Sequence, residues 1–249
     1  MAERKTIFHL IDTGGPGGAE TMFLNLVTGL DSRVWSSVAV LPERDWLWYA
    51  LEEHGVEPVL LPSDGGFDIG YLRQLTRLAK QTGADVIQTH LFTSAVYGTV
   101  AARFLGLPVV CTHHGQTDVA SSGSYRRVKA RIVRRKRNRH VFVSHDLRNF
   151  FDHSRIVAKR DARVIYNGID CQLFSPHAGC EVRSEIGVNP DDILIGAVGN
   201  MRAPKDYPNF LRAAAQLASQ SPLYRFLIAG AADDPIRSEL ELLAQELRL

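Results

Sequence analysis

The sequence predicts an α/β protein made of two consecutive domains, each built on a parallel sheet. Short apolar runs alternate with segments of helical periodicity through most of the 249 residues. This alternation is typical of parallel βαβ units with right-handed crossovers. The apolar runs are continuous, as expected for strands that are buried on both faces. The pattern lapses once, over residues 173–191, and then resumes.

The first domain is predicted over residues 1–172. Its strands are expected where short apolar runs occur, at 7–11, 38–41, 58–61, 85–89, 108–112, 141–143 and 162–166. Apolar residues recur at helical spacing over 19–30, 72–79 and 94–105, and Ser144 is expected to cap a further helix. The domain is therefore predicted to be a complete, Rossmann-like, doubly wound sheet. Ligands of such sheets bind where the carboxyl ends of the strands lead into loops.

A linker and a smaller second domain follow. Residues 173–191 are predicted to be the linker, because Ser175-Pro176 and Asn189-Pro190 favour turns. The second Rossmann-like domain is predicted over 192–249, with strands at 193–199 and 224–229 and helices at 207–219 and from Pro235 onward. Two parallel strands leave long edges and open apolar faces. We therefore expect this domain to be truncated, or to be completed by another chain.

The bulk composition narrows the class of protein. The chain is 45% hydrophobic and 22% charged, which is usual for a soluble globular protein. A net charge of +2 gives no reason to expect a nucleic-acid partner. The sequence shows neither a signal peptide nor an apolar run of the roughly 18 residues that span a membrane. The sparse cysteines, Cys111, Cys171 and Cys180, favour a reducing compartment, so we expect a cytoplasmic protein.

A glycine-rich loop, residues 13–20, joins the first strand to the first helix. Gly15, Gly17 and Gly18 let backbone amides approach a ligand closely, and the start of a helix favours an anion. The loop is therefore suited to a phosphate or a sugar hydroxyl. It matches neither the Rossmann fingerprint nor the Walker loop. A tight turn without a ligand is the alternative.

Three histidines follow predicted strands. His90 comes after 85–89, and His113 and His114 come after 108–112. Such side chains can donate to a sugar hydroxyl or stabilise charge near neutral pH. The spacing offers no third ligand, so no metal site is predicted. For each histidine, a role in the core or in a loop is the alternative.

Two polar motifs follow later strands. Asn167 and Gly168 form a strong turn signal after 162–166. Arg202 and Lys205 lie between the first strand and the first helix of the second domain. These two cations are suited to an anion, because arginine grips phosphate bidentately and lysine adds a mobile charge. The alternative for Asn167 and Gly168 is a structural turn into the linker, and the alternative for Arg202 and Lys205 is a solvated loop.

A basic segment covers residues 125–140 and contains no acid. It is predicted to form a basic helix with a narrow apolar stripe, and such a helix can contact an anionic bilayer or an acidic acceptor. A solvated face is the alternative, and nucleic acid is not expected because no aromatic residues interleave. Its nine cations are Arg126, Arg127, Lys129, Arg131, Arg134, Arg135, Lys136, Arg137 and Arg139.

Taken in order, these motifs resemble those of glycosyltransferase family 4. Together the motifs cover nearly the whole chain. They are Gly14-Gly15-Pro16-Gly17-Gly18-Ala19-Glu20, residues 85–90, Thr112-His113-His114-Gly115, Val143-Ser144, residues 164–170 with Phe174, Gly199-Asn200-Met201-Arg202 with Lys205, and Ile228-Ala229-Gly230.

The resemblance implies a GT-B fold, in which two Rossmann-like domains hold an active site in the cleft between them. The N-terminal domain would mainly bind the acceptor, and the C-terminal domain the nucleotide-sugar donor. The implied activity is hexosyl transfer with retention, without an essential metal or another cofactor. The donor would be linked to UDP or GDP, and the acceptor would be a carbohydrate or a lipid-linked group. A lipid-linked acceptor, and a peripheral position at the cytoplasmic membrane, are suggested by the basic segment.

The resemblance also implies roles for single residues. His114 corresponds best to the family histidine near the transferred sugar, with His113 as the second choice. Arg202 and Lys205 would bind the donor diphosphate, and the backbone at Gly17 and Gly18 would lie near that diphosphate or near the acceptor. Four further residues are expected close to the acceptor or sugar: Gly15, Glu20, His90 and Asn167.

One family feature has no counterpart in this sequence. The family carries a Glu-x7-Glu pair later in its second domain, and Glu239, Glu241 and Glu246 lie before that point, so they are not assigned the role. Activity of the 249-residue chain alone is therefore left open. The alternatives are a non-catalytic carbohydrate- or lipid-binding protein derived from a glycosyltransferase, and a GT-B epimerase of nucleotide sugars.

Overall fold

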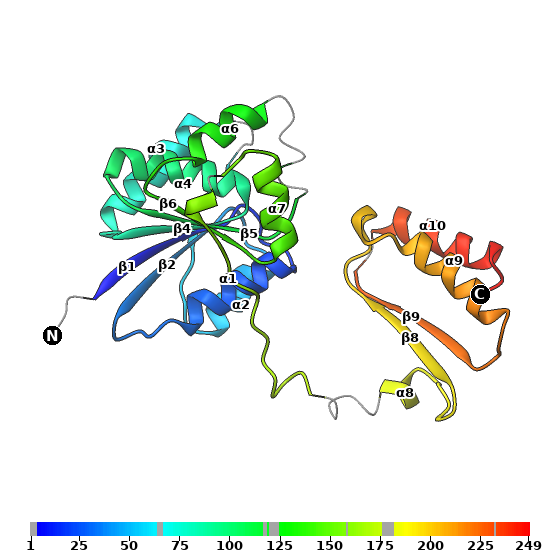
Figure 1. The fold of residues 1–249 in the computed structure, drawn as a ribbon. Helices are drawn as coiled ribbons and strands as arrows, with labels where there is room; N and C mark the ends of the chain where they lie inside the picture. The colour runs from blue at the N-terminus through cyan, green and yellow to red at the C-terminus, as the bar shows by residue number, and fades with distance from the viewer. Residues whose placement is uncertain are drawn as a thin grey trace. The chain divides into compact units, whose positions relative to one another are not determined.

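The computed structural model describes residues 4–63, 67–116, 119, 125–157, 159–175, 182–231 and 233–249. The chain forms two compact units, Met1–Ile169 and Asp170–Leu249. Each unit has its own sheet (Figure 1). Each unit also has its own hydrophobic core.

The N-terminal unit is built on a seven-stranded sheet in which every neighbouring pair is parallel. The strand order is β3-β2-β1-β4-β5-β6-β7, so the predicted doubly wound sheet is confirmed. The strands are β1 (Lys5–Leu10), β2 (Trp35–Leu41), β3 (Val59–Leu60), β4 (Val86–His90), β5 (Val109–His113), β6 (Asn138–Phe142) and β7 (Ala162–Val164).

Helices cover both faces of this sheet. One face packs against α1 (Gly18–Gly29) and α2 (Trp46–Glu53), which bury Phe23 and Leu47. The larger core on the other face packs against four helices, and Figure 1 shows three of them, α3, α4 and α6, on the side of the sheet opposite α1 and α2. These four helices are α3 (Ile69–Gln81), α4 (Phe92–Leu105), α6 (Arg126–Val133) and α7 (His145–His153).

Local sequence signals set several helix starts in this unit. The Asp68 carboxylate accepts a hydrogen bond from the Tyr71 amide at 2.8 Å, which begins α3. Ser144 caps α7 as predicted, because its hydroxyl oxygen accepts from the Leu147 amide at 3.1 Å. Such caps satisfy amides that have no partner within the helix.

The strand order reverses direction beside β1. The chain leaves β1 for α1 on one face of the sheet, whereas it leaves the adjacent β4 for α4 on the other face. The loops after these two strands therefore diverge, and ligands of doubly wound sheets bind in the crevice that such divergence opens. The glycine-rich loop follows β1, and His90 ends β4.

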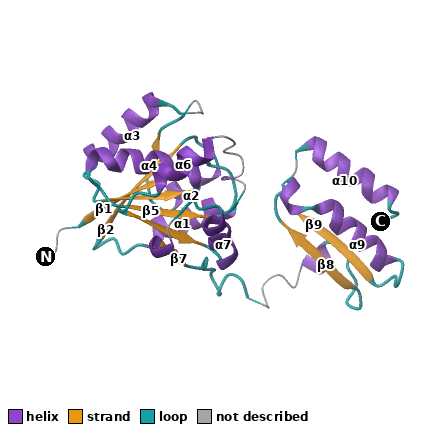
Figure 2. Ribbon diagram, turned by 45° about the horizontal axis from the view of Figure 1, so that its top comes forward, coloured by secondary structure: helices purple, strands orange, loops and turns teal. Residues whose placement is uncertain are grey.

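The second unit has two parallel strands and a small core (Figure 2). Tyr207, Leu211 and Leu240 form the buried cluster of this core and Ala214 is buried as well, whereas Val198 is 85% exposed. Its elements are α8 (Val182–Glu185), β8 (Ile193–Val198), a 3-10 turn (Ala203–Lys205), α9 (Tyr207–Ala218), β9 (Tyr224–Ala229) and α10 (Asp234–Glu246).

The basic segment is not one helix, so that prediction was wrong. Its helix α6 ends at Val133, and the chain then enters β6 at Asn138. Asn138 is fully buried, and its side-chain amide donates to Thr99 Oγ1 at 2.8 Å and to the Val133 carbonyl at 2.9 Å. These bonds fix the turn between helix and strand. Within the described residues, no helix is long and apolar enough to cross a bilayer.

Candidate functional site

The glycine-rich loop is held in place by contacts on two sides. The Leu47 amide donates to the Gly14 carbonyl at 2.8 Å, and a Cβ at Gly15 would lie 3.3 Å from a carboxylate oxygen of Asp45. Gly14 and Gly15 therefore let the loop pack against the start of α2. Gly18, by contrast, begins α1 and faces open space. Gly18 is thus the glycine of this loop with the most room for a ligand.

Glu20 closes the other side of the loop. It is buried on the first turn of α1, where its carboxylate accepts from Thr13 Oγ1 at 2.5 Å and abuts Gly17 so closely that a Cβ there would overlap it. A carboxylate at the start of a helix interacts favourably with the helix dipole. Because Glu20 already places an anion at this end of α1, the arrangement favours a neutral sugar hydroxyl over a diphosphate beside Gly17 and Gly18.

The structure brings His90 and His114 together. His90 Nδ1 lies 2.9 Å from His114 Nε2, and the two rings stack with centroids 5.1 Å apart. Phe23 of α1 packs edge-on against His90, at 5.2 Å between centroids. His90 is thereby linked to the helix that the glycine-rich loop begins. Two of the predicted site histidines thus form one unit at the carboxyl edge of the sheet.

Burial keeps both rings of this pair neutral at pH 7. It lowers the pKa of His114 to about 4. Burial also holds the pKa of His90 well below its usual value, and the neighbouring His114 and His9 add to that effect. In a neutral pair, one ring donates the shared hydrogen and the other accepts it. The pair is therefore suited to hydrogen bonding rather than to stabilising charge as an imidazolium.

Each ring of the pair also has a nitrogen without a partner. His114 Nδ1 and His90 Nε2 are buried and have no hydrogen bond to any described residue. Buried polar atoms normally have a partner, and an unsatisfied one is a common feature of binding sites. His114 is only partly buried whereas His90 is 2% exposed, so His114 is the ring of the pair that lies nearer to the surface.

His113 lies on the other face of the sheet, in the core. It is 1% exposed and packs against Phe142 and Phe151, with ring centroids 5.0 Å and 4.5 Å away. Its Nε2 lies 3.1 Å from His140 Nδ1. Neighbouring residues of a strand point to opposite faces, which is why His113 and His114 have different surroundings. This position favours His114 over His113 as the histidine that meets a ligand.

Leu91 has a backbone conformation that the sequence does not reveal. Its φ is +72° directly after His90, and its amide donates to the Thr112 carbonyl at 3.1 Å. A left-handed φ is uncommon for a residue with a branched apolar side chain. Such conformations cluster at functional sites because the surrounding structure must hold them in place. The sequence gives no signal for it, since glycine or asparagine is the usual residue there.

Asn167 shares no hydrogen bond with these groups among the described residues. It lies in the loop after β7 and is exposed, and the neighbouring Tyr166 ring packs against His145 at 6.0 Å between centroids. No group of three or more histidine, cysteine, aspartate or glutamate residues within the described ranges is arranged to hold a metal ion.

In the second unit, the loop after β8 presents two cations. Arg202 and Lys205 are exposed, and neither has an ion pair or a side-chain hydrogen bond to a described residue. The backbone beneath them is fixed, because Tyr207 donates its hydroxyl to the Gly199 carbonyl at 2.6 Å and the Met201 amide donates to Ala231 at 2.7 Å. Unpaired cations on a fixed loop can bind phosphate without first breaking another contact.

Two glycines make the backbone path of this loop possible. Gly199 and Gly230 have φ values of +152° and +158°, which side chains rarely allow. A Cβ at Gly230 would overlap the Gly199 carbonyl oxygen, and one at Gly199 would lie 3.4 Å from Lys205 Cε. The absence of a side chain at Gly230 therefore lets the two loops after β8 and β9 approach each other closely.

Comparisons with known proteins identify the family. The family model described as Glycosyltransferase Family 4 matches residues 16–173. EpsF of Bacillus subtilis strain 168, which carries the name of a proposed glycosyltransferase, is 24% identical over 266 residues, covering all of this chain and 67% of EpsF.

Solved structures show the same fold. HepE of Anabaena in complex with UDP-glucose is 21% identical with a TM-score of 0.78, covering 99% of this chain and 67% of HepE. Sucrose-phosphate synthase of Thermosynechococcus elongatus is 16% identical with a TM-score of 0.74, covering 99% of this chain and 68% of the synthase.

These likenesses confirm the predicted GT-B fold class, and the chain spans about two thirds of the length of these relatives. Since the family model matches more than half of the residues, the chain belongs to glycosyltransferase family 4.

Proposed function

We propose that this protein transfers a hexose from a nucleotide-sugar donor to a carbohydrate or lipid-linked acceptor with retention of anomeric configuration. The observation that carries the proposal is the family match over residues 16–173, followed in sequence by a fixed loop with two unpaired cations, Arg202 and Lys205. In the reaction, the bond from the anomeric carbon to the diphosphate oxygen breaks, and that oxygen keeps the electron pair. The acceptor oxygen then bonds to the same face of the anomeric carbon, and its proton passes to the departing diphosphate oxygen.

Arg202 and Lys205 would bind the donor diphosphate. Negative charge builds up on this group as its bond to the sugar breaks, and a positioned cation lowers the energy of that state. Arginine can hold two phosphate oxygens at once, whereas lysine contributes a point charge. Neither side chain has a hydrogen bond or an ion pair to a described residue, which supports this assignment.

His114 would hydrogen-bond the transferred sugar through its unpaired Nδ1. Its lowered pKa keeps the ring neutral, so it would orient a hydroxyl rather than offset a charge. The open space at Gly18 would admit a sugar hydroxyl to the first amides of α1. Of the expected nucleotides, UDP is favoured over GDP, because HepE, which has the same fold, has been crystallised with UDP and with UDP-glucose.

The test is a binding titration with the full product of the reading frame that encodes this chain. UDP and GDP are each titrated calorimetrically into the wild-type protein, into Arg202→Ala and into Arg248→Ala. We expect UDP to bind, and Arg202→Ala to weaken binding by about 1.5–3 kcal/mol, the typical contribution of a hydrogen bond to a charged group. Arg248 is exposed in the same unit, so its variant controls for the loss of one charge.

Other outcomes would separate the alternatives. Equal affinity of wild type and Arg202→Ala would overturn the diphosphate assignment. Carbohydrate binding without nucleotide binding would point to a non-catalytic binding protein. Turnover of a nucleotide sugar without any acceptor would point to an epimerase. Where transfer occurs, the anomeric proton coupling of the product, measured by NMR, distinguishes retention from inversion.

A further inference from the structure

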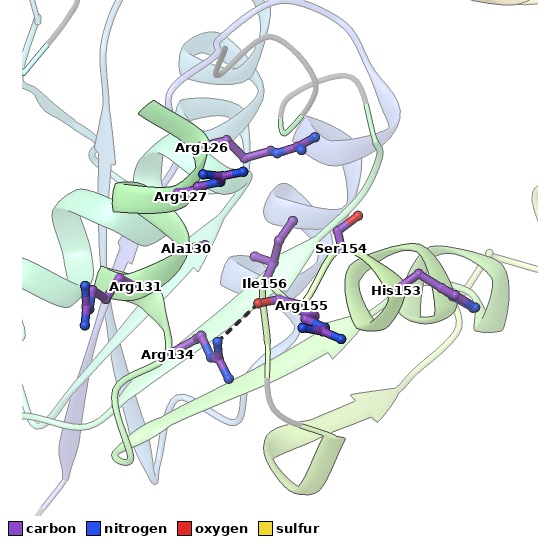
Figure 3. A pocket seen from close by; sticks show the side chains of 9 residues that line it. All are labelled: Arg126, Arg127, Ala130, Arg131, Arg134, His153, Ser154, Arg155 and Ile156. Carbon is purple, nitrogen blue, oxygen red and sulfur yellow. Dashed lines mark hydrogen bonds between the residues drawn. The ribbon is translucent and has the colours of Figure 1, made fainter. Parts of the chain in front are cut away.

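A pocket rich in arginine lies between α6 and the turn that follows α7 (Figure 3). We call it the arginine pocket. Its volume is about 640 Å³, and no carboxylate is among the residues that line it. The lining residues are Arg126, Arg127, Ala130, Arg131, Arg134, His153, Ser154, Arg155 and Ile156.

The arginines of α6 are available for a ligand. Arg126 and Arg127 are exposed, and neither has a hydrogen bond or an ion pair to any described residue. Figure 3 shows both side chains reaching from α6 toward the turn that carries Ser154 and Ile156, whereas the end of Arg131 is turned away. The pocket therefore has at least two guanidinium groups that face it without competing contacts.

The positive charges on α6 destabilise this helix. Arg126 and Arg127 occupy its first turn, where the helix dipole disfavours cations, and no acidic residue offsets them. Arg127 and Arg131 are four residues apart, a spacing at which like charges destabilise a helix. An anion bound beside this turn would relieve both effects. Local preferences that a sequence violates in this way often mark a functional site.

The opposite wall of the pocket is rigid. The Ser154 amide donates to Phe150 and the Ile156 amide donates to Phe151, both at 3.0 Å, so the turn after α7 is fixed. Arg134 Nη1 ties this turn to α6 by donating to the Arg155 carbonyl at 3.3 Å.

Within this turn, Arg155 adopts a φ of +52°, at a position after a helix where glycine is the usual residue. A cationic residue therefore lines the pocket at a position where the backbone conformation is unfavourable for any residue with a side chain. The Ser154 hydroxyl adds a neutral donor beside it.

We propose that the arginine pocket binds a phosphate-bearing group with at least two negative charges, such as a diphosphate. Guanidinium groups recognise phosphate oxygens through paired hydrogen bonds, and several of them together favour a multiply charged ligand over a monoanion. Identifying this group as part of the sugar acceptor rests on the proposed function, whereas the binding of phosphate does not. The site is separate from Arg202 and Lys205, which belong to the second unit.

The test uses inorganic pyrophosphate and the 249-residue chain at low salt. Binding is measured calorimetrically for wild type, for the double variant Arg126→Gln with Arg127→Gln, and for a matched control, Arg73→Gln with Arg77→Gln. Each protein is also measured with Arg202→Ala added, so that the proposed donor site does not contribute. The control pair is exposed on α3 and removes the same charge from the same unit. We expect the pocket variant to bind at least about tenfold more weakly and the control to bind like wild type. Circular dichroism confirms that each variant is folded.

Two results would overturn the proposal. One is folded wild-type protein that does not bind pyrophosphate. The other is an equal loss of affinity in the pocket and control variants, because it would show a diffuse attraction that depends only on net charge. Arg202→Ala should not change pyrophosphate binding at this pocket, so failure of the donor assignment and failure of this proposal are distinguishable.

A vesicle experiment identifies the source of the phosphate. Vesicles of phosphatidylcholine with or without phosphatidic acid are sedimented with each protein. If phosphatidic acid recruits the wild type and the control but not the pocket variant, the phosphate belongs to a lipid headgroup. If the wild type, the control and the pocket variant all stay in solution, while pyrophosphate still binds the pocket variant more weakly than the other two, the pocket binds a soluble phosphate-bearing ligand. If phosphatidic acid recruits all three proteins equally and pyrophosphate binds all three with equal affinity, the proposal that this pocket binds phosphate is wrong.

Discussion

The two units of this chain use the same βα pattern but bury very different amounts of apolar surface. The N-terminal unit encloses its seven-stranded sheet between helices on both faces, and Phe8, Leu10 and Ile87 are completely buried. In the second unit, Val198 of β8 is 85% exposed and the core consists of a few residues from β8, β9, α9 and α10. Hydrophobic stabilisation scales with the apolar area removed from water. We therefore expect the N-terminal unit to be the more stable of the two.

The difference also affects the titratable groups. A large core can bury histidines, and the N-terminal unit buries His9, His90, His113 and His140, with His114 partly buried. The described residues of the second unit include no histidine, and its cations Arg202 and Lys205 are exposed. The first unit should therefore respond strongly to pH, and the second should not.

The largest expected effect is loss of stability in acid, confined to the N-terminal unit. Histidine titrates near pH 6.5 when unfolded, whereas burial lowers the pKa of His9, His114 and His140 to about 4. Between these values the unfolded chain binds more protons, so the free energy of unfolding falls as pH drops from 6.5 toward 4. We expect a loss of several kcal/mol by pH 5, or roughly 10 °C in the melting temperature.

Tryptophan fluorescence can measure this loss selectively, because the three tryptophans, Trp35, Trp46 and Trp48, all lie in the N-terminal unit. A melting temperature that is the same at pH 7 and pH 5 would contradict the neutral, buried state of these histidines. Hydrogen exchange in β8 and β9, corrected for the intrinsic effect of pH, should change little over the same range.

The next effect is specific to the second unit. Gly230→Ala would place a Cβ against the Gly199 carbonyl oxygen at a φ of +158°, and we expect it to cost roughly 2–3 kcal/mol. Because the core of this unit is small, we expect that cost to remove protection from β8 and β9 in hydrogen-exchange mass spectrometry and to leave β4 and β5 protected. Gly18→Ala is the control, since its Cβ would meet open space at the start of a helix. Equal protection in wild type and Gly230→Ala would show that the loop can move aside at little cost.

A third comparison lies within the N-terminal unit, between its two adjacent histidines. His113→Ala would leave a cavity between Phe142 and Phe151 and should cost roughly 2 kcal/mol in urea unfolding. His114→Ala should cost roughly 1 kcal/mol, less than His113→Ala, because the ring is only partly buried and the main loss is the hydrogen bond to His90. In sugar transfer by the full product, the order should reverse, with His114→Ala lowering turnover about 100-fold. The same order in both measurements would exclude a direct role for His114.

The smallest effect concerns helix caps. The Ser144 hydroxyl caps α7, so Ser144→Ala should cost about 1 kcal/mol. Asp233 precedes α10 without a side-chain cap bond, and Asp233→Ala should cost only a few tenths of a kcal/mol. Thermal unfolding of the two variants measures the difference. A larger cost for Asp233→Ala would mean that the second unit depends on its helix ends more than its contacts indicate.

Much of the fold could be predicted from the sequence. The strand predicted at 224–229 coincides with β9, because a short, mostly apolar run bounded by turns is a direct signal for a strand. Helix α2 was not predicted, although Asp45 as its cap and the apolar spacing of Leu47, Trp48 and Leu51 are present in the sequence. The basic segment was predicted as one helix because charge alone does not show where α6 ends. Tertiary hydrogen bonds to the buried Asn138 decide that boundary.

The candidate site could be predicted only in part. Strand ends indicated His90 and His114, and the alternation of side chains along a strand could have placed His113 on the opposite face. The contact between His90 and His114 depends on which strands are neighbours, and the sequence does not state this. The same holds for the arginine pocket, whose two walls come from α6 and from the turn after α7.

The stacked pair of His90 and His114 has one further consequence. The two rings share one hydrogen across 2.9 Å, and that hydrogen can be carried by either ring. When His90 carries it, His114 Nδ1 bears its own hydrogen and can donate; when His114 carries it, Nδ1 offers a lone pair and can accept. The pair is thus a neutral tautomeric relay: without a change in charge, His114 can either donate a hydrogen bond to a ligand oxygen or accept one from a ligand hydroxyl. Nitrogen-15 chemical shifts of the two rings, with and without ligand, would follow this exchange directly.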